Sequence, residues 1–194
     1  MNDAELTETA PAPAGPRWLS TRTLLSCAAI GAAGGLIVAP ISIVSSSGPA
    51  LALPLLYGAL AMVKLLPGLL AQTLLRLPGV ALLTCMIVGL VNIAFSAHGP
   101  LVFVSLAGIG LLQEIPPAIM LYRRWNAWLL VVGNLAVGLV LAWLGWRVLS
   151  SEATHAAMAV GYWIVSAVVA VVIAIVACVI GARVRRSGVV AEQV

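Results

Sequence analysis

The chain has 194 residues, of which 62% are hydrophobic and only 8% charged, and its formal net charge is +4. An average soluble domain carries roughly 25% charged residues, so this composition excludes an ordinary soluble protein. A helix needs about 20 mostly apolar residues to cross a bilayer, which leaves room for several spans but not for a separate catalytic domain. The long apolar runs also lack the alternation of a membrane β-barrel. We therefore expect an all-α integral membrane protein.

Residues 1–19 are polar and rich in alanine and proline, which predicts a disordered leader. Six apolar segments follow, at residues 21–44, 50–75, 80–97, 101–121, 127–149 and 156–182. The second segment contains Lys64 and a Pro-Gly pair, but neither half is long enough to cross alone, so one long kinked span is expected. The sequence thus predicts a six-helix transmembrane domain over residues 20–185, followed by a tail at 186–194.

The positive charges are distributed unevenly between the two sides of such a bundle. One side carries only Arg147, whereas the other side carries eight arginines: Arg17, Arg22, Arg76, Arg123, Arg124, Arg183, Arg185 and Arg186. Loops rich in Lys and Arg remain in the cytoplasm, so both termini are expected to be cytoplasmic. This pattern favours a multi-pass protein of the cytoplasmic (inner) cell membrane.

Two ionisable residues lie inside predicted spans, where a charge costs roughly 2.5–3.5 kcal/mol to insert. Lys64 lies about 14 residues, and Glu114 about 13 residues, from the outer end of its span, which corresponds to similar depths at 1.5 Å per residue. A buried ion pair is one interpretation. The other is that one of the two also meets a polar or cationic ligand, since buried ion pairs seldom add stability over apolar packing.

Further polar and aromatic residues are candidates for a substrate-binding site at the outer end of the bundle. They can stack on a flat heteroaromatic ligand, although for each aromatic residue alone an interfacial belt is the simpler interpretation. For the amides, hydrogen bonding between helices is the alternative. Besides Glu114 and Lys64, the candidates are Gln113, Trp143, Trp146, Trp163, Tyr57, Asn92 and His98.

The first apolar segment contains small residues at helical spacing, among them Ala28, Ala29, Ala32 and Ala33. Such spacing lets helices approach closely. It predicts close packing either inside this bundle or against another membrane subunit.

Other chemistries find no support in the pattern. The GAAGG stretch lies inside a span and lacks the Lys-Ser/Thr ending of a phosphate-binding loop. No nucleophile–base pair or metal-ligand cluster can be assembled, so we expect no catalytic residue, metal site or cofactor. The arginines lie in short clusters beside apolar runs, so nucleic-acid binding is not expected.

Three stretches carry a resemblance to a known family: RLPGVALL at 76–83, GIGLLQE at 108–114 and YRRWN at 122–126. They resemble the substrate-capturing S components of energy-coupling-factor (ECF) vitamin transporters, and within these the YkoE-type branch associated with thiamine or its hydroxymethylpyrimidine precursor. The likeness covers roughly residues 20–185.

The resemblance implies a subunit that binds a vitamin-like molecule from outside and carries it inward. Its partners would be a transmembrane T subunit and two cytoplasmic ATPases, on which ATP would bind. Glu114 matches an acidic position of that family, and Ala28, Ala29, Ala32 and Ala33 match the small residues that dock the T subunit. The alternative is a membrane scaffold or assembly factor that holds a partner through the same face of the first helix.

Overall fold

The computed structural model describes residues 20–45, 53–96, 99–122, 125–149 and 156–186. These residues form helices joined by short turns, and they contain no strand. The helices are α1 (Thr21–Ser45), α3 (Pro54–Val63), α4 (Leu66–Leu75), α5 (Val80–Ile93), α6 (Leu101–Ile119), α7 (Ala127–Leu149) and α8 (Ala156–Arg186).

Each of the six predicted apolar segments is helical at its expected place. The second segment is α3 followed by α4, interrupted at Lys64 and Leu65. Around this break, the amides of Lys64 and Leu65 bond to carbonyls three residues back instead of four. Pro67 follows at once and has no amide hydrogen to continue the helical pattern. The structure therefore confirms one interrupted segment.

Five segments of the described chain are long and apolar enough to cross a membrane: Thr21–Ser45, Pro54–Leu75, Leu101–Ile119, Ala127–Arg147 and Met158–Arg186. The third predicted span is the exception, because its helix α5 covers only Val80–Ile93, 14 residues. At 1.5 Å per residue this helix rises about 21 Å, less than the hydrocarbon thickness of a bilayer. The expected span over residues 80–97 was therefore too long.

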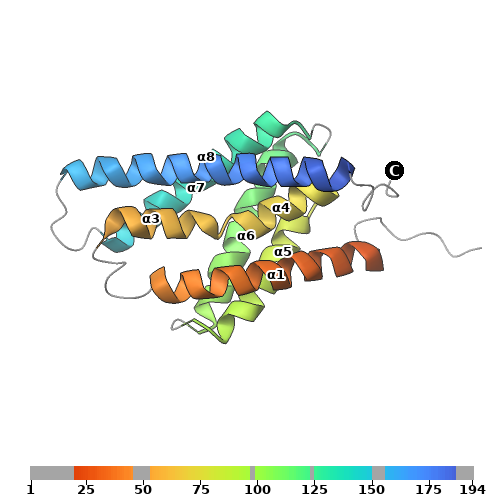
Figure 1. Cartoon of the computed structure of the whole chain (residues 1–194), viewed down its shortest axis with the longest axis horizontal. Coiled ribbons are helices and arrows are strands. Elements are labelled where there is room, and N and C mark those ends of the chain that lie inside the picture. Colours follow the sequence, from red (N-terminus) through yellow and green to blue (C-terminus); the bar gives the residue numbers. More distant parts are fainter. Residues whose placement is uncertain (1–19, 46–52, 97–98, 123–124, 150–155, 187–194) are drawn as a thin grey trace, which may run out of the picture.

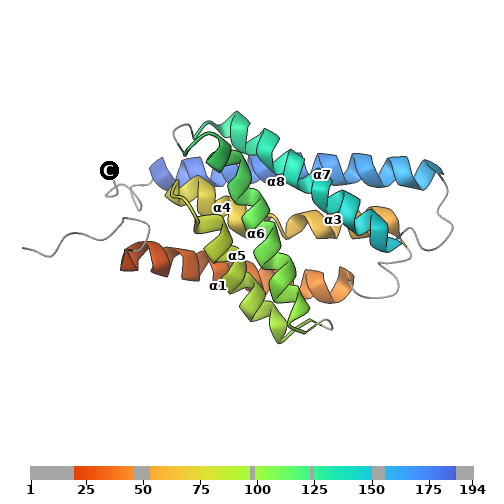
Figure 2. The same ribbon diagram turned by 180° about the vertical axis from the view of Figure 1, so that it is seen from behind.

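The helices form a layer crossed by a hairpin. Helices α1, α3–α4 and α8 run alongside one another, and the α5–α6 pair crosses them steeply in both views (Figures 1 and 2). The start of α1 and the ends of α4 and α8 share one end of the molecule, while the end of α1 and the starts of α3 and α8 share the other (Figure 1). We call these the basic end and the opposite end.

The distribution of arginines matches these two ends. Arg22, Arg76, Arg183, Arg185 and Arg186 belong to the helix termini at the basic end, where Arg185 also donates a hydrogen bond to the Thr73 carbonyl of α4. Arg147 belongs to the last turn of α7. The cytoplasmic location of the basic end remains a prediction from the charge pattern.

Glycines allow the crossing hairpin to approach α1. A β-carbon at Gly31 would lie 2.8 Å from the Ile87 side chain, and one at Gly35 would lie 2.9 Å from Val91, both on α5. A larger residue at either position would push the helices apart. The glycines of α1 thus serve packing within the bundle.

The outer surface of the bundle is apolar on many sides. Leu36, Val104 and Ile119 expose about two thirds or more of their side chains, at 66%, 64% and 72%. A helix that is apolar around its circumference suits a lipid environment.

Candidate functional site

Aromatic side chains gather where α3, α7 and α8 meet, towards the opposite end. Tyr162 is fully buried, lies 5.4 Å from the Trp146 ring and 6.2 Å from the Trp163 ring, and donates a hydrogen bond to the Ala142 carbonyl. Tyr57 joins them from α3 beside Gly145, where an added β-carbon would lie 3.2 Å from its ring. We call these four residues, Tyr57, Trp146, Tyr162 and Trp163, the aromatic cluster.

Two other candidates from the sequence do not join this cluster. Trp143 is 49% exposed, and the Arg147 guanidinium lies 5.2 Å from its ring centre, an arrangement suited to a membrane–water interface. His98 lies outside the described residues.

Lys64 lies at the break between α3 and α4 and is half-buried. It follows Tyr57 by seven residues, about two helical turns, and lies just past the end of α3 on the side that carries Tyr57. Lys64 is therefore placed about 10 Å farther than Tyr57 from the opposite end.

Glu114 is buried near the end of α6, where its carboxylate binds two donors. Its Oε1 accepts a hydrogen bond of 2.8 Å from the Ala81 amide, and its Oε2 accepts one of 3.1 Å from the Tyr122 hydroxyl. Ala81 lies in the first turn of α5, whose free amides and helix dipole favour a negative charge. Glu114 thus caps a neighbouring helix.

An unusual turn brings Tyr122 back to this carboxylate. Leu121 and Tyr122 have positive φ angles of 50° and 55°, and the Tyr122 amide bonds to the Pro117 carbonyl. Burial, followed by the nearby Glu114 charge, raises the pKa of Tyr122 to about 12. The phenol therefore remains a hydrogen-bond donor at neutral pH.

The structure does not bring Glu114 together with Lys64 or with the aromatic cluster. The described residues contain no ion pair between Glu114 and Lys64, although Gln113 donates a 2.8 Å hydrogen bond to the Leu65 carbonyl. From Gly133, which packs on Pro116 near Glu114, α7 rises about 20 Å before reaching Trp146. Lys64 and Glu114 lie at similar depths along their spans, but this does not bring them together, because depth does not determine the direction in which each side chain points.

The intramembrane amides join helices to one another. Asn92 on α5 donates to the Gly35 carbonyl of α1 at 3.2 Å, and Asn134 on α7 donates to the Ala170 carbonyl of α8 at 2.8 Å. Both bonds agree with the interhelical interpretation of these residues.

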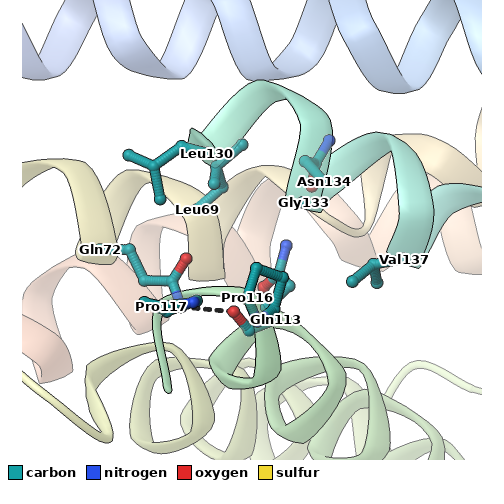
Figure 3. Close-up of a pocket in the computed structure, with 9 residues that line it drawn as sticks. All are labelled: Leu69, Gln72, Gln113, Pro116, Pro117, Leu130, Gly133, Asn134 and Val137. Carbon is teal, nitrogen blue, oxygen red and sulfur yellow. Dashed lines mark hydrogen bonds between the residues drawn. The ribbon is translucent and has the colours of Figure 1, made fainter. Parts of the chain in front are cut away.

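A second polar group, which we call the central amide cluster, consists of Gln72, Gln113 and Asn134 from α4, α6 and α7 (Figure 3). Gln72 Nε2 donates to the Gln113 carbonyl at 2.8 Å. That carbonyl is free because Pro117, four residues on, has no amide hydrogen. The cluster therefore forms at the proline pair of α6.

The alanines of α1 face away from the bundle. Ala29, Ala32 and Ala33 are exposed and Ala28 is half-buried. Beside them runs an apolar groove of about 190 Å³ between α1 and the α3–α4 segment. It is lined by Ile30, Ala33, Gly34, Ile37, Val38, Val63, Leu66, Pro67 and Leu70.

Three residues at the centre of these arrangements were not among the site candidates: Tyr162, Gln72 and Tyr122. Tyr122 entered the sequence analysis only through the YRRWN stretch that carries the family resemblance. Gln72 lies inside an apolar run, and an intramembrane amide is a signal that could have drawn attention to it. Within the described residues, no three His, Cys, Asp or Glu residues are grouped as metal ligands would be.

This chain is similar to a known protein family and to a solved structure. The model of a family described as "ABC-type cobalt transport system, permease component" matches residues 22–140. A solved structure described as "Crystal structure of an S-component of ECF transporter" is similar with a TM-score of 0.76 at 14% identity, over 88% of each chain. None of the curated proteins matches.

Proposed function

The chain belongs to the family of permease components of ABC-type cobalt transport systems, and we propose that it is the substrate-binding S component of an ECF-type ABC transporter. A permease component is not itself an enzyme. The observation that carries the proposal is the S-component fold, which extends over 88% of the chain. In this role the subunit binds a small molecule from outside, and separate ATPase subunits drive uptake.

We place the substrate at the aromatic cluster. Tyr57, Trp146 and Trp163 are half-buried and come from three helices at the end opposite the arginines, which the charge pattern predicts to face outward. Aromatic faces from several helices suit a flat ring, which they hold by stacking. Lys64 lies deeper on the face of α3 that carries Tyr57 and supplies a polar group below the rings.

The proposed substrate is thiamine or its hydroxymethylpyrimidine precursor. The aromatic cluster supports this class, because pyrimidine rings stack on tryptophan and a cationic thiazolium ring is attracted to its face. Cobalt is the second candidate, because the family description names it. The two candidates differ in chemistry and are separable in one binding experiment.

The test uses the purified full chain in lipid nanodiscs, titrated calorimetrically with thiamine, hydroxymethylpyrimidine and Co²⁺. We expect one organic ligand to bind and Trp146→Leu to weaken that binding at least tenfold. The exposed Trp143→Leu, on the same helix, is the matched control and should change affinity less than twofold. Binding of Co²⁺ without either organic ligand would instead support cobalt, and equal affinity in both tryptophan variants would place the site elsewhere.

The proposed partners are a transmembrane T subunit, docked on the exposed alanines of α1, and two cytoplasmic ATPases. The exposure of Ala29, Ala32 and Ala33 supports this docking surface. A scaffold or assembly factor would use the same surface. It would bind none of the three ligands, and its partner assembly would tolerate Lys64→Met.

A further inference from the structure

A small cavity lies at the junction of α4, α6 and α7, inside the central amide cluster (Figure 3). Its volume is about 10 Å³, close to the smallest space that accepts one water molecule. The lining residues are Leu69, Gln72, Gln113, Pro116, Pro117, Leu130, Gly133, Asn134 and Val137.

The cavity contains a hydrogen-bond acceptor without a protein donor. Asn134 is 3% exposed, its Nδ2 is bonded to Ala170, and its Oδ1 has no partner among the described residues. Gln72 is 1% exposed, and its Nε2 is bonded to the Gln113 carbonyl. In Figure 3 the Gln72 oxygen points away from that bond, toward Leu69. Asn134 therefore offers one buried acceptor without a protein donor, and Gln72, on a second helix, turns its amide oxygen toward a residue that lines the same cavity.

The number and type of these groups decide which ligand fits. A buried acceptor needs a donor, and a water molecule provides two. A hard metal cation would need about six oxygen ligands, and amide oxygens from two residues do not provide that shell. The volume excludes anything larger than water.

We propose that one water molecule is bound in this cavity as a fixed part of the fold, donating hydrogen bonds to Asn134 Oδ1 and Gln72 Oε1. It joins α4 to α7 beside the proline pair of α6, where the helical hydrogen-bond pattern is interrupted. The site is separate from the proposed substrate site, since it lies at the level of Gly133 and not at the aromatic cluster.

The proposal is tested by radiolytic hydroxyl labelling of the full chain in nanodiscs with ¹⁸O water, followed by peptide mass spectrometry. A bound water labels its neighbours even where bulk water is excluded, so we expect label on Leu69 or Pro117. Leu106, which is 1% exposed and does not line the cavity, is the internal control. Labelling of Leu69 and Pro117 no higher than that of Leu106 would overturn the proposal.

A cavity-filling variant provides the second arm. Val137→Leu places an extra methylene where the water is proposed and should lower the labelling of Leu69 and Pro117 at least fivefold at unchanged helix content. Unchanged labelling in a folded variant would contradict the site.

If Val137→Leu does not fold, the unmodified protein still decides the question by NMR. We expect cross-relaxation between water and the side-chain amides of Gln72 and Asn134. Asn92, fully buried with an unpartnered oxygen but not lining the cavity, is the comparator. A water signal at Asn92 equal to that at Asn134, or none at Asn134, would refute the inference. None of these measurements requires a substrate, so they are independent of the proposed transport function.

Discussion

Replacing Glu114 distinguishes a structural role of its carboxylate from a ligand-binding role. The carboxylate accepts one hydrogen bond from the first turn of α5 and one from Tyr122 at the end of α6. Glu114→Leu removes both acceptors, whereas Glu114→Gln keeps an amide oxygen that can accept the Ala81 bond without the charge. The two variants should therefore differ in stability.

The magnitudes follow from the contacts. A hydrogen bond to a charged group contributes about 1.5–3 kcal/mol, and a negative charge at a helix N-terminus adds about 0.3–1 kcal/mol. The Tyr122 hydroxyl is only part-buried, so its bond should lie at or below the lower end of that range. We expect Glu114→Leu to lower the free energy of unfolding by about 3 kcal/mol, and Glu114→Gln by about 1 kcal/mol. Tyr122→Phe should cost about 1 kcal/mol alone and close to nothing when Glu114 is already Leu.

The measurement is reversible unfolding in mixed detergent micelles, followed by circular dichroism, for the four proteins and the double variant. Substrate binding is measured on the same samples. The reasoning would be refuted if Glu114→Leu were as stable as the unmodified chain, or if Tyr122→Phe cost the same in both backgrounds. A variant that kept its stability but lost binding would assign the carboxylate to the ligand instead.

Other changes test the packing, the phenol and the proposed docking face. Gly34→Ala should lower the free energy of unfolding by about 1–3 kcal/mol, because its β-carbon would lie 2.7 Å from the rigid ring of Pro67 on α4. Gly108→Ala, whose β-carbon would have no other group within 4 Å, should raise it slightly. Unfolding titrations of the two variants test this difference. The phenol of Tyr122 should titrate near pH 12, because its pKa is raised; the measurement is the difference in absorbance at 295 nm between the unmodified chain and Tyr122→Phe. The contribution of this protonated phenol to the free energy of unfolding is present below about pH 10 and is lost as the pH rises through 12. An inflection at pH 10 would contradict the contact with the carboxylate. Ala32→Leu should leave stability unchanged but reduce copurification with the T subunit at least fivefold, whereas Val172→Leu, at an exposed position of α8, should not; equal copurification of both would remove α1 as the docking face.

The candidate site could be predicted only in part. Aromatic residues near the ends of the last two spans pointed to Trp146 and Trp163, and the structure places both rings beside Tyr162. The same reasoning included Trp143, which faces outward, because residues three positions apart differ by about 60° around a helix and only tertiary packing decides which one is covered.

Whether Lys64 and Glu114 form an ion pair could not be predicted from the sequence, for a related reason. Depth along a span follows from residue counting, but the azimuth of a side chain and the crossing angle of its helix do not. In this fold the α5–α6 hairpin crosses the other helices steeply (Figures 1 and 2). Glu114 consequently meets the start of α5 and not α3.

The sequence alone determined the class of the protein, the position of each helical segment, the break near Lys64 and the segregation of arginine to one side. These properties follow from local hydropathy, from proline and from charge, which act within one segment at a time. The tertiary structure decided that α5 is short, that Tyr162 lies at the centre of the aromatic cluster, and that Gln72, Gln113 and Asn134 line one small cavity. Each of these depends on which faces of distant helices come together, because a buried polar group in lipid finds its partner only where another helix supplies it.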